Sequence, residues 1–287
     1  MKPLLRWLLL LLLAVLALQL FFVLRIATMA LLAPQSSAFQ RSEAWRLVSE
    51  KDQLKWRQQW VSYEKLSEHL KRAVIASEDD SFVDHDGIDW EALEKAWQKN
   101  TRAEARAAKR ATKPAKTGRV KVVGGSTITQ QLAKNLFLSG ERTLLRKGQE
   151  FVITLLLEAI LSKQRILEIY LNSVEWGEGV FGAEAAAQHY FRKRASELTP
   201  LEAARLAVML PRPRYFEKLP NSGYLAERAA VRAEQLLDAE VIGGAELQRR
   251  QAESQQAQAE VSAASDQLRV LGMSVEAIAQ LTRTRTV

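Results

Sequence analysis

The chain has 287 residues, which is enough for one medium-sized domain with appendages. It contains no cysteine, which excludes disulfides and thiolate metal sites, and its three widely spaced histidines do not predict a histidine-rich metal site. The formal net charge of +8 belongs to one segment, because residues 95–121 hold ten basic side chains and one acidic side chain. The rest of the chain sums to about −1, so composition does not favour a nucleic-acid partner.

The N-terminus carries a long apolar segment. Between Arg6 and Arg25 lie eighteen residues whose only clearly polar member is Gln19. At about 1.5 Å per residue such a helix spans roughly 27 Å, close to the thickness of a bilayer's hydrocarbon core. A cleaved signal peptide would have a shorter apolar core and two small residues spaced two apart, and the alanines here lack that spacing. We therefore predict a short cytoplasmic tail and one uncleaved transmembrane helix in residues 1–33.

Beyond the anchor, the sequence predicts a juxtamembrane segment at 34–59, a mainly α domain at 60–245 and a Gln/Ala-rich tail at 246–287 that cannot build its own core. Residues 43–76 are predicted to be largely helical, the glycine-rich stretch 176–182 is predicted to be a loop, and no strand is expected. Apolar residues at helical spacing predict further helices at about 89–100, 127–138, 143–162, 164–171, 183–191, 200–209 and 224–240.

A basic, alanine-rich insertion covers about residues 101–119, and we expect it to be a flexible extension. In a membrane-anchored protein, anionic headgroups are a nearer partner for such a segment than DNA. We therefore expect contact with membrane lipids, although a tolerated surface insertion without function stays open.

The segment Val74–Trp90 contains three consecutive carboxylates, Glu78–Asp80, and a histidine between two further aspartates. A calcium loop of the EF-hand type does not fit. If Gly87 takes loop position 6, Phe82 falls at position 1 and Leu93 at position 12, where acids are needed. A general base fits better, because repulsion between adjacent acids raises the pKa of one of them. A solvated acidic loop is the plain alternative.

The next motif, "GGSTITQQLAKNLFL", places two glycines and two hydroxyls at a predicted helix start, where free N–H groups favour anions. Thr127, Gln131, Lys134 and Asn135 fall on one face of this helix. Exposed helix faces usually carry Glu and Lys, so this stripe indicates a binding face, and an ordinary amphipathic helix is the alternative.

A third group adds cations. Arg142, Arg146 and Lys147 precede Glu150, and Arg146 and Glu150 are spaced as an i, i+4 pair. The helix continues as "FVITLLLEAIL", which must be buried, so its polar first turns are expected at the rim of a cleft. A base, an anion site and several cations suit displacement of a phosphate-type leaving group. A glycosidase would instead need a second, protonated acid.

These residues carry a family resemblance. From about Trp60 to Pro220 the chain resembles the monofunctional peptidoglycan glycosyltransferases, the lysozyme-like family 51 domains also found in bifunctional penicillin-binding proteins. The matching segments, in family order, are "SEDDSFVDHDGID", "GGSTITQQLAKNLFL", "RKGQE", "KQRILEIYLN" with "WGEGVFGAEAAAQHYF", and "LTPLEAARLAVMLPRP". The resemblance implies a mainly α, lysozyme-like fold.

The resemblance also implies roles. Glu78 would be the catalytic base that activates the acceptor sugar's 4-hydroxyl, and Glu150 the second essential carboxylate. Asp79, Phe82 and His85 would complete the first motif. The residues expected to line the donor side and its pyrophosphate are Ser126, Thr127, Gln131, Lys134, Asn135, Arg142 and Arg146. No metal ligand is predicted among them, and a Mg²⁺ or Mn²⁺ ion at the pyrophosphate is left open.

The implied substrates are lipid II and the growing glycan strand, which would be extended through β-1,4 links with inversion and release of undecaprenyl pyrophosphate. The implied location is the bacterial inner membrane, with a single span and the catalytic domain on the periplasmic face. Partners among cell-wall synthesis or division proteins are left open. "SYEK" at 62–65 and "KTG" at 116–118 lie too close together for a penicillin-binding site, so no transpeptidase activity is expected. A lytic glycan-cleaving enzyme and a non-catalytic cell-wall scaffold remain the alternatives.

Overall fold

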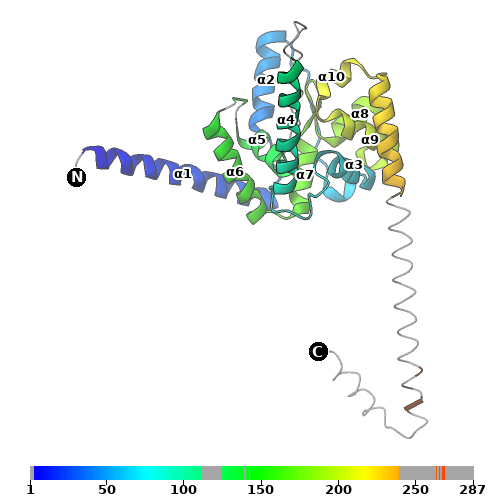
Figure 1. Ribbon diagram of the computed structural model, residues 1–287, viewed down its shortest axis with the longest axis horizontal. Helices are drawn as coiled ribbons and strands as arrows, with labels where there is room; N and C mark the ends of the chain where they lie inside the picture. Colours follow the sequence, from blue (N-terminus) through cyan, green and yellow to red (C-terminus); the bar gives the residue numbers. More distant parts are fainter. Residues whose placement is uncertain are drawn as a thin grey trace. The chain divides into compact units, whose positions relative to one another are not determined.

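A computed structural model describes residues 3–110, 125–138, 140–141 and 143–238, together with positions 263, 265, 267 and 268. The chain divides into two compact units, Met1–Ala233 and Glu234–Val287, and the first unit contains every helix and strand labelled in Figure 1. Helices dominate this unit, which confirms the prediction of a mainly α fold. The predicted tail 246–287 lies almost wholly outside the described residues.

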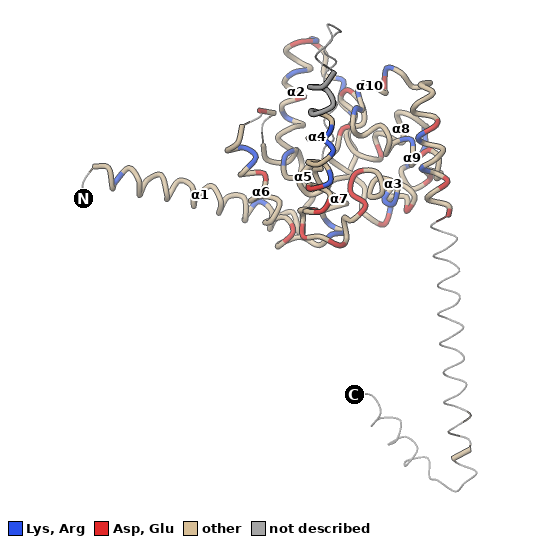
Figure 2. The backbone as a smooth tube through the Cα atoms, viewed as in Figure 1, with Lys and Arg blue, Asp and Glu red and all other residues tan. Residues whose placement is uncertain are grey.

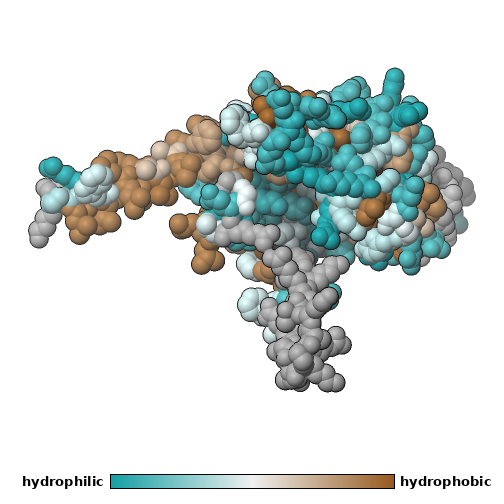
Figure 3. Space-filling model, turned by 90° about the horizontal axis from the view of Figure 1, so that it is seen from above, coloured by the Kyte–Doolittle hydropathy of each residue, from teal (hydrophilic) through white to brown (hydrophobic). Residues whose placement is uncertain are grey.

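The apolar N-terminal segment forms one helix, α1 (Pro3–Leu31). Among the described residues it is the one helix long and apolar enough to cross a membrane. Figure 3 shows its surface as a hydrophobic, brown rod. Its C-terminal half is not a free rod, because Phe22, Ile26 and Met29 follow one another at helical spacing and are buried against the domain.

The prediction that residues 43–76 are largely helical holds only for the two ends of that range, because residues 52–67 interrupt the helix. Helix α2 (Ala38–Lys51) begins at a capping box in which Ser37 and Gln40 exchange hydrogen bonds, and it ends at Asp52 in the left-handed conformation. A short strand, β1 (Arg57–Gln58), and a 3₁₀ turn, η1 (Tyr63–Lys65), separate it from α3 (Glu68–Glu78). The break depends on pairing with a distant segment, which local periodicity does not reveal.

The stretch predicted to be a loop at 176–182 contains a β-hairpin instead. Strands β2 (Glu175–Gly177) and β3 (Val180–Phe181) pair antiparallel, and β1 pairs parallel with β3, in the order β1-β3-β2. Gly179, at φ +73°, lies so close to Lys55 that an added Cβ would fall 1.9 Å from the Lys55 carbonyl oxygen. Strands of two or three residues are too short for an alternating pattern, so the sequence showed none.

The remaining predicted helices are present. They are α5 (Ile128–Phe137), α6 (Leu144–Ile160), α7 (Lys163–Ser173), α8 (Ala183–Phe191), α9 (Pro200–Met209) and the helical residues 223–238. A short helix that was not predicted, α10 (Pro213–Lys218), follows α9. Between α8 and α9 lies a 3₁₀ turn, η2 (Ala195–Glu197). Helix α7 is central, because every residue from Ile166 to Ser173 is buried. It packs against α5, α6 and α8, while α3 packs on α9.

Helix α4 (Trp90–Arg110) runs ten residues past its predicted end at residue 100, so the basic insertion begins as helix rather than as a flexible extension. Figure 2 shows basic positions in blue along the described part of α4. Residues 111–119 of the insertion lie outside the described part of the chain. Alanine-rich, charged sequence favours helix strongly enough to explain the longer α4.

Candidate active site

Glu78 is the last residue of α3, and its carboxylate is held from across the site. Gln131 on α5 donates from Nε2 to Glu78 Oε2 at 2.8 Å, and the buried Tyr170 hydroxyl donates to Gln131 Oε1 at 3.0 Å. Tyr170 therefore fixes which way the Gln131 amide points. Burial raises the Glu78 pKa above its ordinary value, and the charge of Asp79 adds to the effect, while Gln131 and Lys134 oppose it. This carboxyl is suited to taking a proton.

The neighbouring carboxylate, Asp79, is in a different environment. Its Oδ2 accepts the backbone N–H of Ile128 at the start of α5 (2.9 Å), and its Oδ1 lies 2.8 Å from His85 Nε2. Because the Gly87 N–H donates to His85 Nδ1 at 3.0 Å, Nδ1 carries no proton and Nε2–H is the donor to Asp79. Asp79 thus ties the acidic loop to the helix N-terminus.

The rest of the first motif supports this loop. Phe82 is fully buried, and Lys163 Nζ lies 4.7 Å from its ring centroid while also bonding the His85 carbonyl oxygen. Thr127 caps α5 and donates to the Gly87 carbonyl oxygen at 2.6 Å, so its hydroxyl is buried in the cap rather than on a pocket wall. The other acids of this segment, at positions 80, 84 and 86, are exposed.

A pocket of about 540 Å³ adjoins this cluster, and its lining residues form two groups of different chemistry. Several of the predicted residues line it. From the α5 and α6 side these are Ser126, Gln131, Lys134, Asn135, Arg146 and Glu150, joined by Gln130, Leu138, Gly140 and Lys147. A second wall comes from α2, β2, α10 and the ends of α7 and α9, and it consists of Phe39, Val174, Glu175, Leu210, Pro211 and Pro213. Gln131 belongs both to the pocket and to the hydrogen bond with Glu78, so the base candidate adjoins the pocket.

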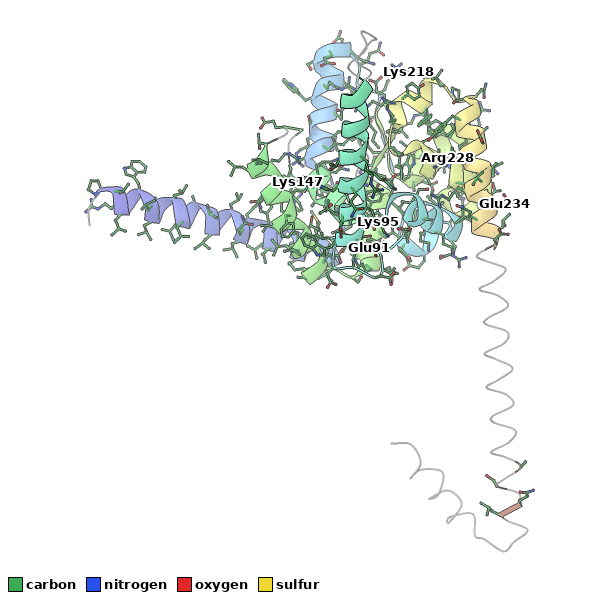
Figure 4. The ribbon with its side chains drawn as sticks, in the orientation of Figure 1. Glu91, Lys95, Lys147, Lys218, Arg228 and Glu234 are labelled. Atoms are coloured by element: carbon green, nitrogen blue, oxygen red, sulfur yellow. The ribbon has the colours of Figure 1, made fainter. Side chains whose placement is uncertain are left out.

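Glu150 is buried on α6 and paired with two cations. Arg146 NH1 lies 2.9 Å from Glu150 Oε2, and Lys147 Nζ bonds Oε1 (Figure 4 labels Lys147 on α6). Arg146 Nε is buried and has no hydrogen-bond partner among the described residues. An unmatched donor at a pocket wall is costly unless a ligand satisfies it. Together with Lys134, this wall offers cations and a donor to an anionic group.

Sequence reasoning missed Glu175, which lines the second wall from β2. Arg214 Nε on α10 donates to its Oε1 at 2.9 Å. Burial raises the pKa of Glu175 to about 7, although Arg214 opposes the shift. The one available signal was an acid between two apolar residues, Val174 and Trp176, because its cationic partner is distant in sequence.

Two predictions concern features outside this geometry. Arg142 lies outside the described residues. Among the residues that the structure does describe, no group of three His, Asp or Glu side chains could hold a metal ion. The donor set of the α5–α6 wall does not fit a resident divalent cation, because its carboxylate, Glu150, is already paired with Arg146 and Lys147.

Comparison with known proteins gives one consistent result. A family model described as "Transglycosylase" matches residues 46–239. A protein named "Biosynthetic peptidoglycan transglycosylase" from Burkholderia thailandensis is 53% identical over 226 residues, which cover 79% of this chain and 82% of that protein. A protein with the same name from Herminiimonas arsenicoxydans is 51% identical over 79% of this chain and 93% of its own length. Another, from Paraburkholderia phytofirmans, is 49% identical over 79% of this chain and 88% of its own length. The chain that builds this pocket therefore belongs to the transglycosylase family.

Proposed function

We propose that this protein is a peptidoglycan glycosyltransferase that polymerises lipid II into β-1,4-linked glycan strands, with inversion and release of undecaprenyl pyrophosphate. The observation that carries the proposal is the placement of Glu78. Its carboxylate has a raised pKa and is held by Gln131 at the edge of a pocket whose α6 wall presents Glu150 with two cations.

In the proposed reaction, the 4-hydroxyl of the acceptor sugar gives its proton to Glu78 while its oxygen bonds to C1 of the donor. The bond from C1 to the pyrophosphate oxygen breaks on the opposite face, so an α-linked donor gives a β-linked product. Lys134, Arg146 and Lys147 receive the departing negative charge, which removes the need for an acid to protonate the leaving group. Glu150 keeps Arg146 and Lys147 in position for this task.

The remaining predicted residues receive supporting roles. Asp79, Phe82, His85 and Thr127 hold the acidic loop against α5, so that Glu78 is presented at a fixed place. Ser126 and Asn135 line the donor side of the pocket. The contribution of Arg142, at the donor pyrophosphate, rests on the sequence alone.

The membrane location is part of the same proposal. The apolar surface of α1 fits a single span of the bacterial inner membrane, and a lipid-linked substrate would reach a site anchored next to that membrane. Lys2 and Arg6 favour a cytoplasmic N-terminus, which places the catalytic domain on the periplasmic face. Membrane lipids are then direct partners of the anchor.

The decisive experiment measures glycan formation from lipid II by the full-length protein in detergent. Glu78→Gln keeps a side chain of the same shape but cannot accept the proton, so kcat should fall by roughly 10²–10⁴-fold. Asp80→Asn is the matched control. It neutralises an exposed carboxylate two residues after Glu78, so it should change kcat little.

Full activity of Glu78→Gln would overturn the proposed mechanism. Cleavage of purified, lipid-free glycan strands by the wild type would instead support a lytic enzyme. A protein without turnover in either assay, unaffected by either substitution, would support a scaffold.

A further inference from the structure

The second wall of the pocket, outside α5 and α6, has its own chemistry. Phe39, Val174, Leu210, Pro211 and Pro213 make it largely apolar, and Glu175 is the one ionisable side chain among these residues. The α5–α6 wall carries Lys134, Arg146 and Lys147. A ligand that contacts both walls therefore meets cations on one and an apolar surface with a single carboxyl group on the other.

The two walls favour different parts of a glycosyl diphosphate. The diphosphate is drawn to the cationic wall and repelled by a carboxylate. A sugar ring is uncharged, presents C–H groups on its faces and carries hydroxyl and amide donors at its edge, so it suits an apolar wall with one hydrogen-bond acceptor. The two walls are thus matched to the two chemical halves of such a substrate.

Glu175 is held in place for contact with a ligand. Arg214 on α10 reaches it with Nε at 2.9 Å and with NH2 at 2.8 Å, and both contacts use Oε1. Among the contacts of the described residues this leaves Oε2 as the oxygen available to a ligand. Arg214 is in turn paired with Glu43 on α2, and Glu43 is paired with Arg46. The two contacts with Arg214 fix the carboxyl group, and Arg214 itself does not line the pocket.

We propose that Glu175 is a substrate-contacting specificity residue, which accepts a hydrogen bond from a hydroxyl or acetamido N–H group of an N-acetylhexosamine ring on this wall. By excluding the diphosphate from its side, it also sets the direction in which the sugar chain lies in the pocket. This inference rests on the proposed function and adds to it the residue that recognises the sugar portion of the substrate.

The protonation of Glu175 gives a readout that a purely structural role would not move. Its pKa of about 7 is set by burial, which raises it, by Arg214 and Arg46, which lower it, and by Glu43, which raises it. The Tyr190 hydroxyl, on α8, has its own pKa raised partly by Glu175 and stays neutral. Only the ionised carboxylate accepts through both oxygens, so sugar binding should strengthen as pH rises through about 7.

The test compares Glu175→Gln with Glu43→Gln in the full-length protein in detergent. Two quantities are measured between pH 6 and 8.5: kcat/KM on lipid II, and the affinity for a soluble β-1,4 N-acetylhexosamine oligomer. Glu175→Gln should lower both by roughly tenfold at pH 8, the size expected for one charge-assisted hydrogen bond, and should abolish the change near pH 7. Glu43→Gln also removes a partner of Arg214, but Glu43 does not line the pocket, so both quantities should stay within about twofold at pH 8. Because Glu43 raises the Glu175 pKa, the change near pH 7 should remain in this variant but move to lower pH.

Thermal unfolding of each variant checks the fold. If Glu175→Gln unfolds, Glu175→Asp is measured instead, because it keeps a charge for Arg214 but withdraws the carboxylate from the pocket, and it should lose oligomer affinity too. Wild-type values in the Glu175 variants, or equal losses in Glu43→Gln, would overturn the inference. If the wild type makes no polymer from lipid II, the proposed function fails, whereas oligomer binding still decides the role of Glu175.

Discussion

Gln19 is the only clearly polar side chain in the apolar span between Arg6 and Arg25, and its amide faces the catalytic domain. It exchanges two hydrogen bonds with Gln149 on α6, at 3.1 and 3.2 Å, and Gln149 directly precedes Glu150. The buried Phe22 packs edge-on against Phe137 of α5, with ring centroids 5.4 Å apart. We predict that Gln19→Leu weakens the docking of α1 on α6 and lowers polymerisation, because α6 carries Glu150 and its cations.

The magnitude follows from the two bonds. Interhelical hydrogen bonds in membranes average about 0.6 kcal/mol each, which gives a coupling of about 1 kcal/mol for the reciprocal pair. Gln19→Leu also leaves the partly buried amide of Gln149 without its partner, so the single substitution should cost about 1–3 kcal/mol of docking free energy. That corresponds to roughly a 5- to 150-fold shift in the docked population. The double variant Gln19→Leu/Gln149→Leu should recover part of the loss, because no amide is then left unpaired.

Two assays check this prediction. The first measures polymerisation by Gln19→Leu, Gln149→Leu and the double variant, with Leu20→Ala as the control, since Leu20 is 58% exposed on α1. The second uses the absence of native cysteine: cysteines placed at positions 19 and 149 should be joined by a short bifunctional thiol reagent in the membrane. Unchanged activity of Gln19→Leu, together with no cross-linking, would refute the idea that the anchor is docked on the catalytic helix.

Two further predictions concern the frame around the site. Gly179→Ala should strongly destabilise the protein, because its φ of +73° disfavours any side chain and the added Cβ would fall 1.9 Å from the Lys55 carbonyl oxygen; a melting temperature equal to wild type would contradict the tight β1–β3 contact. Deleting residues 101–118 should reduce polymerisation in anionic liposomes but not in neutral detergent, because the deletion removes basic residues that attract anionic headgroups. If the deletion variant is as active as the wild type in anionic liposomes, the segment is a tolerated insertion.

The helices that the sequence predicted well have strong local signals. Helix α9 was predicted at its observed bounds, because Thr199 and Glu202 form a capping box, Pro200 opens the first turn and apolar residues follow at helical spacing. The break between α2 and α3 had no comparable signal. It depends on hydrogen bonding of Arg57 to Gly179, a contact between segments far apart in the chain. Hydrophobic periodicity reports local structure, and it cannot report a pairing of that kind.

In the candidate site, too, contacts between residues close in sequence were predictable and contacts between distant residues were not. Arg146 and Glu150 are one helical turn apart, so their pairing was visible as an i, i+4 spacing. The bond between Glu78 and Gln131 joins two motifs that the family resemblance had already placed together. Glu175 was missed because Arg214, which holds it, lies 39 residues away and on another element. Its neighbours in sequence are apolar, and they gave no sign of a pocket wall.

The acidic run also shows why adjacent carboxylates take different tasks. Asp79 receives donors on both oxygens, from the Ile128 N–H and from His85, and these bonds hold the loop against α5. Glu78 receives one neutral amide donor and is desolvated, so its negative charge is less favoured, and the charge of Asp79 disfavours it further. Asp79 therefore has two effects: it holds the loop in place, and its charge helps to keep the Glu78 pKa above that of an ordinary glutamate. A run of acids that would be redundant in water becomes, in this fold, one anchoring carboxylate beside one proton acceptor.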